Sequence, residues 1–227
     1  MRISGSGTLS EGRINDELNA SGSVKLKGNF ECEGFHSSGS LRGEGNLIVH
    51  GEMDTSGSFR LMGALYGDSN YRSSGTTSIE GEIIVKGELE NSGSLRVGNN
   101  LEAVQGIRIS GSTHVKGGLK SKSLIKITGS STIHGDVNGF DVSLGRKGLT
   151  KRSMYKHPNK VYGSVYGRDK INLINSLVEK DVKGRNVYIG PKTEVLGTVY
   201  YVDSIEVDDN AVLNNEPVQI KEEELID

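Results

Sequence analysis

Hydrophobic and polar residues alternate along most of this chain, in short runs that repeat with a fixed period. The residue between two apolar positions is usually polar, and alternation with a period of two is typical of a strand with one buried side. The pattern therefore predicts three short strands in each repeat. The repeat that starts at Gly93 fills all six apolar positions, which alternate with polar ones in three pairs: Leu95 and Val97, Leu101 and Ala103, Ile107 and Ile109.

A triplet of small residues, Ser-Gly-Ser or its Thr variants, marks each repeat. Glycine and small polar residues can adopt the left-handed or bridging dihedral angles of a sharp corner. Three strands and three corners make one turn of a triangular coil, and repeats of this length are typical of solenoids. The spacing of the triplet glycine is nearly constant and lengthens by one position after the third: Gly5, Gly22, Gly39, Gly57, Gly75, Gly93, Gly111 and Gly129.

We therefore predict an all-β fold, a single-stranded parallel β-helix with about 17–18 residues per coil. About 11–12 coils would give a rod roughly 50–60 Å long at the usual spacing of strands. Stacked coils pair through their backbones and bury one continuous apolar column, which an isolated coil could not do. The period alone fits a right-handed or a left-handed helix.

The repeats divide the chain into four parts. Residues 1–145 carry regular coils, and residues 161–213 return to the coil pattern. Between them, residues 146–160 hold six Lys or Arg and no acidic residue, so they form either a basic loop or a degenerate coil. Residues 171–178 could be a strand pair or a short helix, and we expect strands. Residues 214–227 are an acidic tail that we expect to fray.

Composition narrows the class of protein. Hydrophobic residues make up 33% of the 227 residues and aromatic residues 5%, which is too little bulk for a thick globular core. The 27 basic and 29 acidic residues nearly balance, which argues against a nucleic-acid binder. Cys32 is the single cysteine, and we expect a buried thiol. No apolar stretch approaches the ~20 residues of a membrane span, and the first residues lack a hydrophobic signal. We therefore expect a cytoplasmic protein.

The tandem SGS-x-x-ϕ-x-G units of residues 1–145 and 163–213 resemble those of the bactofilins, bacterial cytoskeletal proteins that form polymers. The resemblance implies a right-handed triangular β-helix that assembles end to end, without nucleotide, into non-polar filaments. It also implies a scaffold for cell shape, envelope assembly or motility, whose partners would be further copies, a paralogue, or envelope and motility proteins. Many bactofilins contact membrane through an N-terminal tail, whereas here the first repeat glycine is already Gly5. Membrane contact of the filament therefore stays open.

The two ends of such a rod are candidate self-association surfaces. A terminal coil presents unpaired backbone groups and an open apolar cross-section, which solenoids usually cap. Here the first coil begins almost at Met1, with no capping helix ahead of it. If Gly197 is taken as a repeat glycine, the last coil supplies the opposite face. The predicted end residues are Ile3, Leu9 and Leu18 at one end, and Val199, Tyr201, Ile205, Val207 and Val212 at the other.

Equal offsets in successive coils should stack into surface columns. The third position after the triplet glycine aligns four basic residues, which form either a stripe for an anionic partner or a solvated face neutralised by nearby acids. The ninth position aligns three apolar residues that would point outward. Soluble surfaces avoid such ladders, so this column is either a lateral contact or is covered by a loop or the tail. The basic stripe comprises Lys25, Arg42, Arg60 and Arg96, and the apolar ladder comprises Ile48, Tyr66 and Ile84.

Motifs for chemistry are weak in this sequence. We find neither a phosphate-binding loop nor a dinucleotide fingerprint, so no cofactor is expected, and no histidine has metal-ligand spacing. His114 and His134 lie in consecutive coils and would be the general-base candidates of a left-handed hexapeptide acyltransferase trimer. A monomeric β-solenoid binding module is the second alternative. We interpret the chain as a non-enzymatic scaffold, in which both histidines are surface residues.

Overall fold

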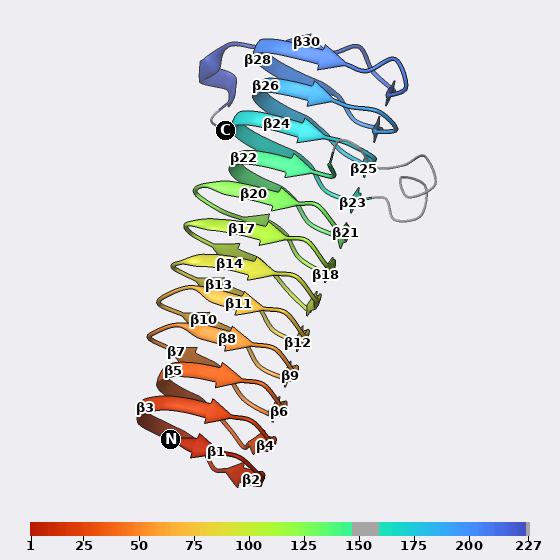
Figure 1. Cartoon of the computed structure of the whole chain (residues 1–227). Coiled ribbons are helices and arrows are strands. Elements are labelled where there is room, and N and C mark those ends of the chain that lie inside the picture. Colours follow the sequence, from red (N-terminus) through yellow and green to blue (C-terminus); the bar gives the residue numbers. More distant parts are fainter. Residues whose placement is uncertain (147–158, 226–227) are drawn as a thin grey trace.

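The computed structural model describes residues 1–146 and 159–225, which form a rod of stacked coils (Figure 1). All strand pairings are parallel, and these residues include one short 3-10 helix, η1 (Glu222–Leu225), but no α-helix. The first coil lies at one end of the rod and the last coil at the other (Figure 1). The predicted all-β parallel β-helix is confirmed.

One face of the rod, which we call the first face, is a sheet of twelve strands, one from each coil. This number agrees with the 11–12 coils that the repeat predicts. Its strands are β2 (Ser6–Leu9), β4 (Ser23–Leu26), β6 (Ser40–Gly43), β9 (Ser58–Leu61), β12 (Thr76–Ile79), β15 (Ser94–Val97), β18 (Ser112–Val115), β21 (Ser130–Ile133), β23 (Asn159–Val161), β25 (Ser176–Val178), β27 (Glu194–Val195) and β29 (Val212–Leu213).

The other two faces belong to one sheet of eighteen strands. The second face holds β7 (Leu47–Val49), β10 (Leu65–Gly67), β13 (Ile83–Val85), β16 (Leu101–Ala103), β19 (Leu119–Lys120) and β30 (Val218–Gln219). The third face holds β1 (Arg2–Ile3), β8 (Met53–Thr55), β11 (Tyr71–Ser73), β14 (Glu88–Asn91), β17 (Gly106–Ile109) and β20 (Leu124–Ile127). Six longer strands cross both faces: β3 (Gly12–Ala20), β5 (Phe30–Ser37), β22 (Val137–Leu144), β24 (Val165–Leu173), β26 (Val182–Ile189) and β28 (Val199–Val207).

The core is a column of apolar side chains along the rod axis. In β15, Leu95 and Val97 are buried while Arg96 between them is exposed, as the alternation predicts. The same pattern recurs from coil to coil, so each coil adds several buried side chains, each worth about 1.5–3 kcal/mol. The rod interior is polar near the triplet corner, where the Tyr71 hydroxyl lies 3.0 Å from the Thr77 hydroxyl. The Thr77 hydroxyl also lies 2.9 Å from the Ser73 hydroxyl, so these three buried groups satisfy one another across the corner.

The triplet glycines are required by close stacking of the coils. The Ser94 N–H donates to the Gly75 carbonyl at 3.0 Å, and a Cβ on Gly93 would lie 1.9 Å from the same oxygen. Every triplet glycine from Gly22 to Gly129 meets the preceding coil in this way, at 1.8–2.1 Å. The sequence argument from corner dihedral angles is wrong here, because none of the triplet glycines has a positive φ. Any side chain at these positions would push two coils apart.

The coil stack continues directly across the basic segment. β21 pairs with β23, with Ile133 opposite Val161, so no coil lies between these strands. Of residues 146–160, Asn159 and Lys160 belong to β23, while residues 147–158 of the predicted loop or coil lie outside the described residues. Residues 171–178 are strands, as expected, since β24 ends at Leu173 and β25 follows. The stack also extends past residue 213, because β30 pairs with β28.

Candidate self-association and docking surfaces

The N-terminal end of the rod presents three strand edges, one on each face. In the described chain β1 and β2 each pair with one strand only, and the start of β3 pairs only with β5. Ile3, Leu9 and Ile14 pack against the core beside these edges and are only partly buried. The predicted placement of Leu18 is wrong: it is fully buried, because that half of β3 pairs with β1 on one side and β5 on the other.

The C-terminal end has the same arrangement. β29 pairs only with β27, β30 only with β28, and the end of β28 only with β26, as far as the described residues show. Tyr201 and Ile205 are partly buried against the core, and Val207 is 40% exposed. Ile205 and Val207 therefore lie at the open end of the rod, whereas the predicted placement of Tyr201 is wrong, because β30 lies over it with Gln219 in register.

Two other residues predicted for this end lie elsewhere. Val199 is fully buried, because β30 continues the stack above the start of β28. Val212 is 54% exposed, but it is in register with Glu194 in the outward column of the first face. Its side chain therefore faces the side of the rod.

The error at this end came from the choice of repeat glycine. A Cβ on Gly197 would approach the backbone of Lys180, so Gly197 occupies a different corner from the triplet glycines. Counting from the register of β27 and β29 instead identifies Leu213 as the inward end residue. Leu213 and Ile14 are the end residues that the sequence argument missed, and the alternation within each strand was the signal for them.

Beyond β30, the acidic tail lies along the side of the rod. η1 packs next to β26, where the Arg185 guanidinium pairs with Asp203 at 3.1 Å and also with Glu222. The hydrogen bond to Asp203 is the main cause that raises the pKa of Arg185. Figure 1 shows η1 beside the upper coils. Residues 214–225 therefore leave the end of β28 and all of β29 unpaired on their outer sides.

The predicted basic stripe forms one column on the first face. Lys25 pairs with Glu44 at 2.6 Å, and Arg60 pairs with Glu80 at 3.1 Å, so half of the stripe is neutralised. The Lys25 ammonium also lowers the pKa of the Glu44 carboxyl by a hydrogen bond. The outward residues in register are Thr8, Lys25, Arg42, Arg60, Ser78, Arg96 and His114.

The other half of the stripe is free. Within residues 1–146 and 159–225, neither Arg42 nor Arg96 has an ion-pair partner, because Met62 and Lys116 stand where Glu80 stands relative to Arg60. Met62 is 59% exposed. Binding of an anionic partner to this column stays a prediction.

The apolar ladder is a continuous column on the second face. Ile48, Tyr66 and Ile84 are in direct register, with Glu31 below and Glu102 above. Ile48 is 38% exposed, and the other two side chains are partly buried. Tail residues 214–225 lie at the opposite end of the rod, so they do not cover the ladder (Figure 1). A lateral contact at this ladder stays a prediction.

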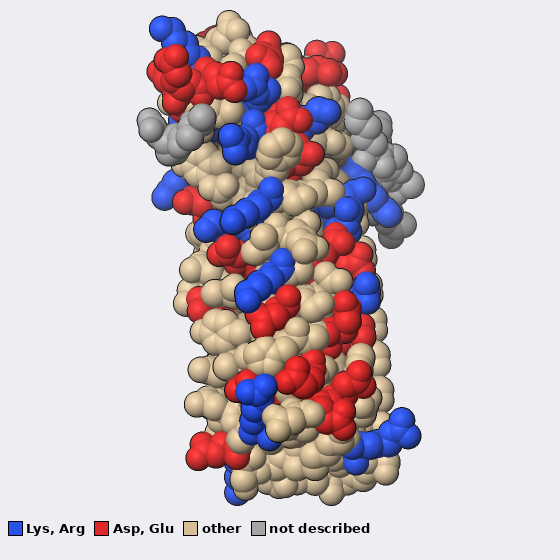
Figure 2. Space-filling model, turned by 90° about the vertical axis from the view of Figure 1, so that its left-hand side faces the viewer, with Lys and Arg blue, Asp and Glu red and all other residues tan. Residues whose placement is uncertain are grey.

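The charges beside the ladder are internally paired. Glu31 lies 3.2 Å from Arg13 and accepts a hydrogen bond from His50 at 2.8 Å, and Glu102 lies 3.7 Å from Lys120. The Tyr66 hydroxyl donates to Glu82 at 3.0 Å, which raises the pKa of Tyr66. The ladder is therefore an apolar strip between neutralised charges. Figure 2 shows acidic and basic side chains interspersed along a side of the rod.

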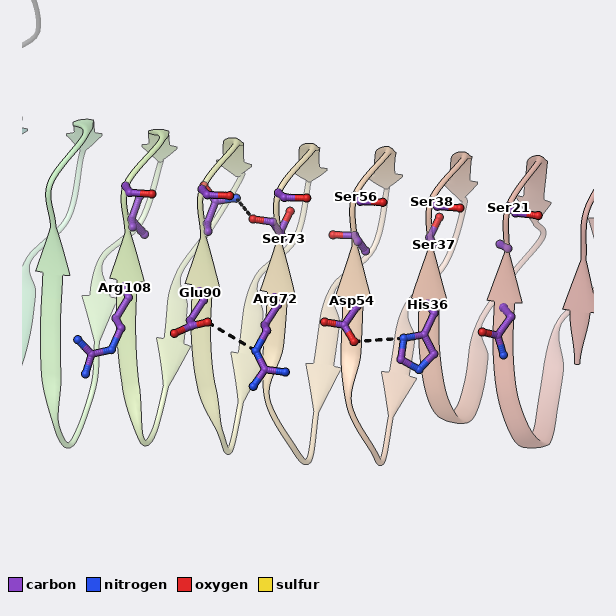
Figure 3. Close-up of a pocket in the computed structure, with 18 of the residues that line it drawn as sticks. Ser21, His36, Ser37, Ser38, Asp54, Ser56, Arg72, Ser73, Glu90 and Arg108 are labelled. Carbon is purple, nitrogen blue, oxygen red and sulfur yellow. Dashed lines mark hydrogen bonds and ion pairs between the residues drawn. The ribbon is translucent and has the colours of Figure 1, made fainter.

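A polar groove of about 1040 Å³ runs along the third face beside the triplet corner, and the sequence argument missed it (Figure 3). One wall is a column of serines that precede the triplet glycines, and the other is a column of polar residues in which the charge alternates in sign from Asp54 to Arg108 (Figure 3). His36 lies 3.2 Å from Asp54 and Arg72 lies 3.5 Å from Glu90. The stacking of equal offsets could have predicted both columns. The charged residues that line the groove are Arg2, Asp54, Arg72, Glu90, Arg108 and Lys126, so basic residues outnumber acidic ones there.

The two candidate catalytic histidines lie side by side on the first face and its corner. The rings of His114 and His134 are 5.2 Å apart, and His134 stacks on Tyr162 at 4.8 Å. Burial, followed by the charges of His134, Arg96 and Lys116, lowers the pKa of His114. No carboxylate bonds to either ring within the described part of the chain, so neither is oriented as a general base usually is.

Cys32 is buried, as predicted, and burial is the main cause that raises the pKa of its thiol to about 12. Such a thiol is unreactive at neutral pH. Among residues 1–146 and 159–225 no three metal-ligating side chains gather, and no helix there is long and apolar enough to cross a membrane.

The fold and these surfaces define a parallel β-solenoid with two open ends and columns of charged residues on its sides. Comparisons with protein-family models, with curated proteins and with solved structures find no match for this chain.

Proposed function

We propose that this protein is a non-enzymatic scaffold that assembles end to end into filaments without nucleotide. The observation that carries the proposal is the pair of rod ends, where strand edges that have no partner among the described residues adjoin partly buried apolar side chains. An unpaired strand edge is a template for another strand. The second copy would supply both backbone partners and apolar cover.

The energetics favour association at the ends over association at the sides. Each end combines free backbone groups with apolar surface, and covering apolar surface contributes about 25 cal/mol per Å². The sides carry ion pairs that are already satisfied within one chain, such as Arg60 with Glu80. The resemblance to bactofilins supports the same assembly and the role of a scaffold for cell shape, envelope assembly or motility. Such a filament would lie in the cytoplasm, free or against a membrane.

Negative-stain microscopy and light scattering of the purified chain without nucleotide test this proposal. We expect filaments that grow with concentration. Leu9→Asp should give monomers or short species, because a carboxylate would be buried at the joint. Thr8→Asp is the matched control, since Thr8 is exposed in the same strand and should leave assembly intact.

Three results would contradict the proposal. They are polymers of Leu9→Asp as long as those of the native chain, a native chain that stays monomeric at high concentration, and a fixed trimer with cofactor-dependent acyl transfer. The second would favour a binding module and the third an acyltransferase. Circular dichroism of each variant checks that the coils still form.

The apolar ladder adds a proposed lateral contact between filaments. Tyr66→Lys places a charge in the centre of the ladder and should abolish bundling while filament length is unchanged. Ser78→Lys adds the same charge to the first face and serves as the control. Bundles of unchanged thickness for Tyr66→Lys would refute the contact.

A further inference from the structure

The rods of this protein have two different ends, and we infer that they join head to tail, so that the filament is polar. The inference rests on the proposed end-to-end assembly and names its partner surface: the C-terminal end of one copy seats on the N-terminal end of the next. The strand directions, the inward columns, the end charges and the mismatch between like ends support it.

Each open strand at one end has a counterpart on the same face at the other end. The first face ends in β2 and β29, the second in the start of β3 and in β30, and the third in β1 and the end of β28. All pairings in the rod are parallel, so these three counterparts run in the same direction. Stacking one rod on another in the same orientation therefore continues all three ladders at once (Figure 1).

The inward columns also match across such a joint. On the third face one inward column starts at Ile3 and ends at Val207, and on the first face another starts at Leu9 and ends at Leu213. Three of these residues are partly buried, and Val207 is 40% exposed. Head-to-tail stacking places Val207 on Ile3 and Leu213 on Leu9. Each column then continues with an apolar contact, as it does between coils inside the rod.

Charge supplies the third feature. The outward column of the third face starts at Arg2 and ends at Glu206, and neither residue has an ion-pair partner within residues 1–146 and 159–225. Inside the same column, Arg72 and Glu90 pair across neighbouring coils at 3.5 Å. A head-to-tail joint sets Glu206 one strand spacing, about 4.8 Å, from Arg2 of the next copy. The joint would therefore add one pair of opposite charges, like the pairs in the middle of the same column.

A joint between like ends lacks this match. A two-fold contact that sets β1 against β1 of a second copy places Arg2 near Arg2, and the corresponding contact at the other end places Glu206 near Glu206. Like charges directly opposite across a strand pair are destabilising. The second face is less decisive, because Gln219 ends the inward column that starts at Ile14. The end faces thus favour polar filaments over the non-polar filaments that the bactofilin resemblance implies.

Two variants that each block one end test the polarity by sedimentation velocity. Leu9→Asp blocks the N-terminal end, and Leu213→Asp blocks the C-terminal end. Under conditions in which the native chain polymerises, each variant alone should stay monomeric. Their equimolar mixture should form a one-to-one dimer, because one free end of each kind remains.

The outcomes separate the inference from the proposed function. A dimer of either variant alone, or a mixture that stays monomeric, would overturn head-to-tail stacking. A native chain that does not polymerise would remove the proposed function itself. Circular dichroism first establishes that both variants fold.

Charge exchange provides a second test that does not depend on the apolar variants. Arg2→Glu or Glu206→Arg alone should raise the critical concentration for assembly about threefold or more, since an exposed ion pair is replaced by repulsion. The chain carrying both changes should recover the native value. A double variant that assembles no better than the singles would contradict the predicted pair.

Discussion

The coils before and after the basic segment share one core but close their corners differently. Up to Gly129 the triplet corner depends on a glycine whose missing side chain lets successive coils touch. After residue 158 the corresponding corners use Asn175 and Lys192, which have φ angles of 50° and 57°. Where two coils approach closely, only glycine fits, because a Cβ atom would clash with the preceding coil. A corner with a left-handed φ angle accepts a polar residue, at a cost in free energy. The same solenoid therefore tolerates two solutions at one corner.

The long strands mark a second difference. In the middle of the rod the second and third faces meet at a break between short strands, whereas β24, β26 and β28 run across both faces. Their pairing shifts register between Gly167 and Lys170, and again between Gly184 and Asn186. The first residues of β24, β26 and β28 pair in register, and they are separated along the chain by the same number of residues as the first three triplet glycines. Those glycines belong to the coils of β3 and β5, which are also long strands. A coil of the shorter length thus bends its strand through the corner.

The largest expected effect comes from adding one methyl group to a triplet glycine. Gly93→Ala would set a Cβ 1.9 Å from the Gly75 carbonyl oxygen, so the coils must separate and weaken the ladder around it. We expect a loss of about 3 kcal/mol in the free energy of unfolding, at the upper end for overpacking. Urea unfolding below the concentration of assembly measures it.

Gly5→Ala is the matched control for that change. Gly5 is the first triplet glycine, and a Cβ there would meet nothing within 4 Å. Its free energy of unfolding should stay within ~0.5 kcal/mol of the native value, as for most surface substitutions. Equal losses at Gly5 and Gly93 would show that stacking is not the reason for the triplet.

A smaller effect is expected at the later corner. Asn175→Ala keeps a side chain at a φ of 50° without the polar group that tolerates this angle, and should cost about 1 kcal/mol. Asn175→Gly should change the free energy of unfolding by less, because glycine adopts this angle freely. If both variants lose the same amount, the backbone angle is not what the corner requires.

The smallest effect concerns the charged columns of the regular coils. Hydrogen bonds to Glu31 and then Asp68 raise the pKa of His50, and the bond from His50 is the main cause that lowers the pKa of Glu31. The pKa of Asp68 is lowered first by the hydrogen bond from Lys86 and then by that from His50. A histidine whose pKa is raised by folding stabilises the fold when the pH is below the ordinary histidine pKa of about 6.5. That stabilisation is lost as the pH rises through the raised pKa. The lowered carboxyl pKa values act in the opposite sense, so their contribution is lost only in acid.

His50→Gln should therefore flatten the change in stability as the pH rises above the ordinary histidine pKa, and should affect the change in acid less. The effect should be slight, because a third of the His50 side chain is exposed. NMR titration provides the direct measurement: the pKa of His50 should lie above the ordinary histidine value and that of His114 below it. If His50 and His114 titrated with the same pKa, the environments that the structure gives these two side chains would be contradicted.

The sequence predicted the fold because a solenoid is nearly one-dimensional. Equal offsets stack, so the period alone placed Lys25 below Arg42 and Ile48 below Tyr66, as the structure shows. The same reasoning failed where the period changed. Counting from Gly197 misassigned the last coil, and the burial of Leu18 and Val199 depended on which neighbouring strands lie over them.

The sequence by itself determined the coil, its period and which side chains point inward, since each of these follows from local alternation repeated many times. Only the tertiary structure decided why the glycines are needed, which strands remain unpaired at each end, and where the acidic tail lies. Those features depend on contacts between coils that are far apart or at the boundary of the array, where the repeat carries no information about what comes next.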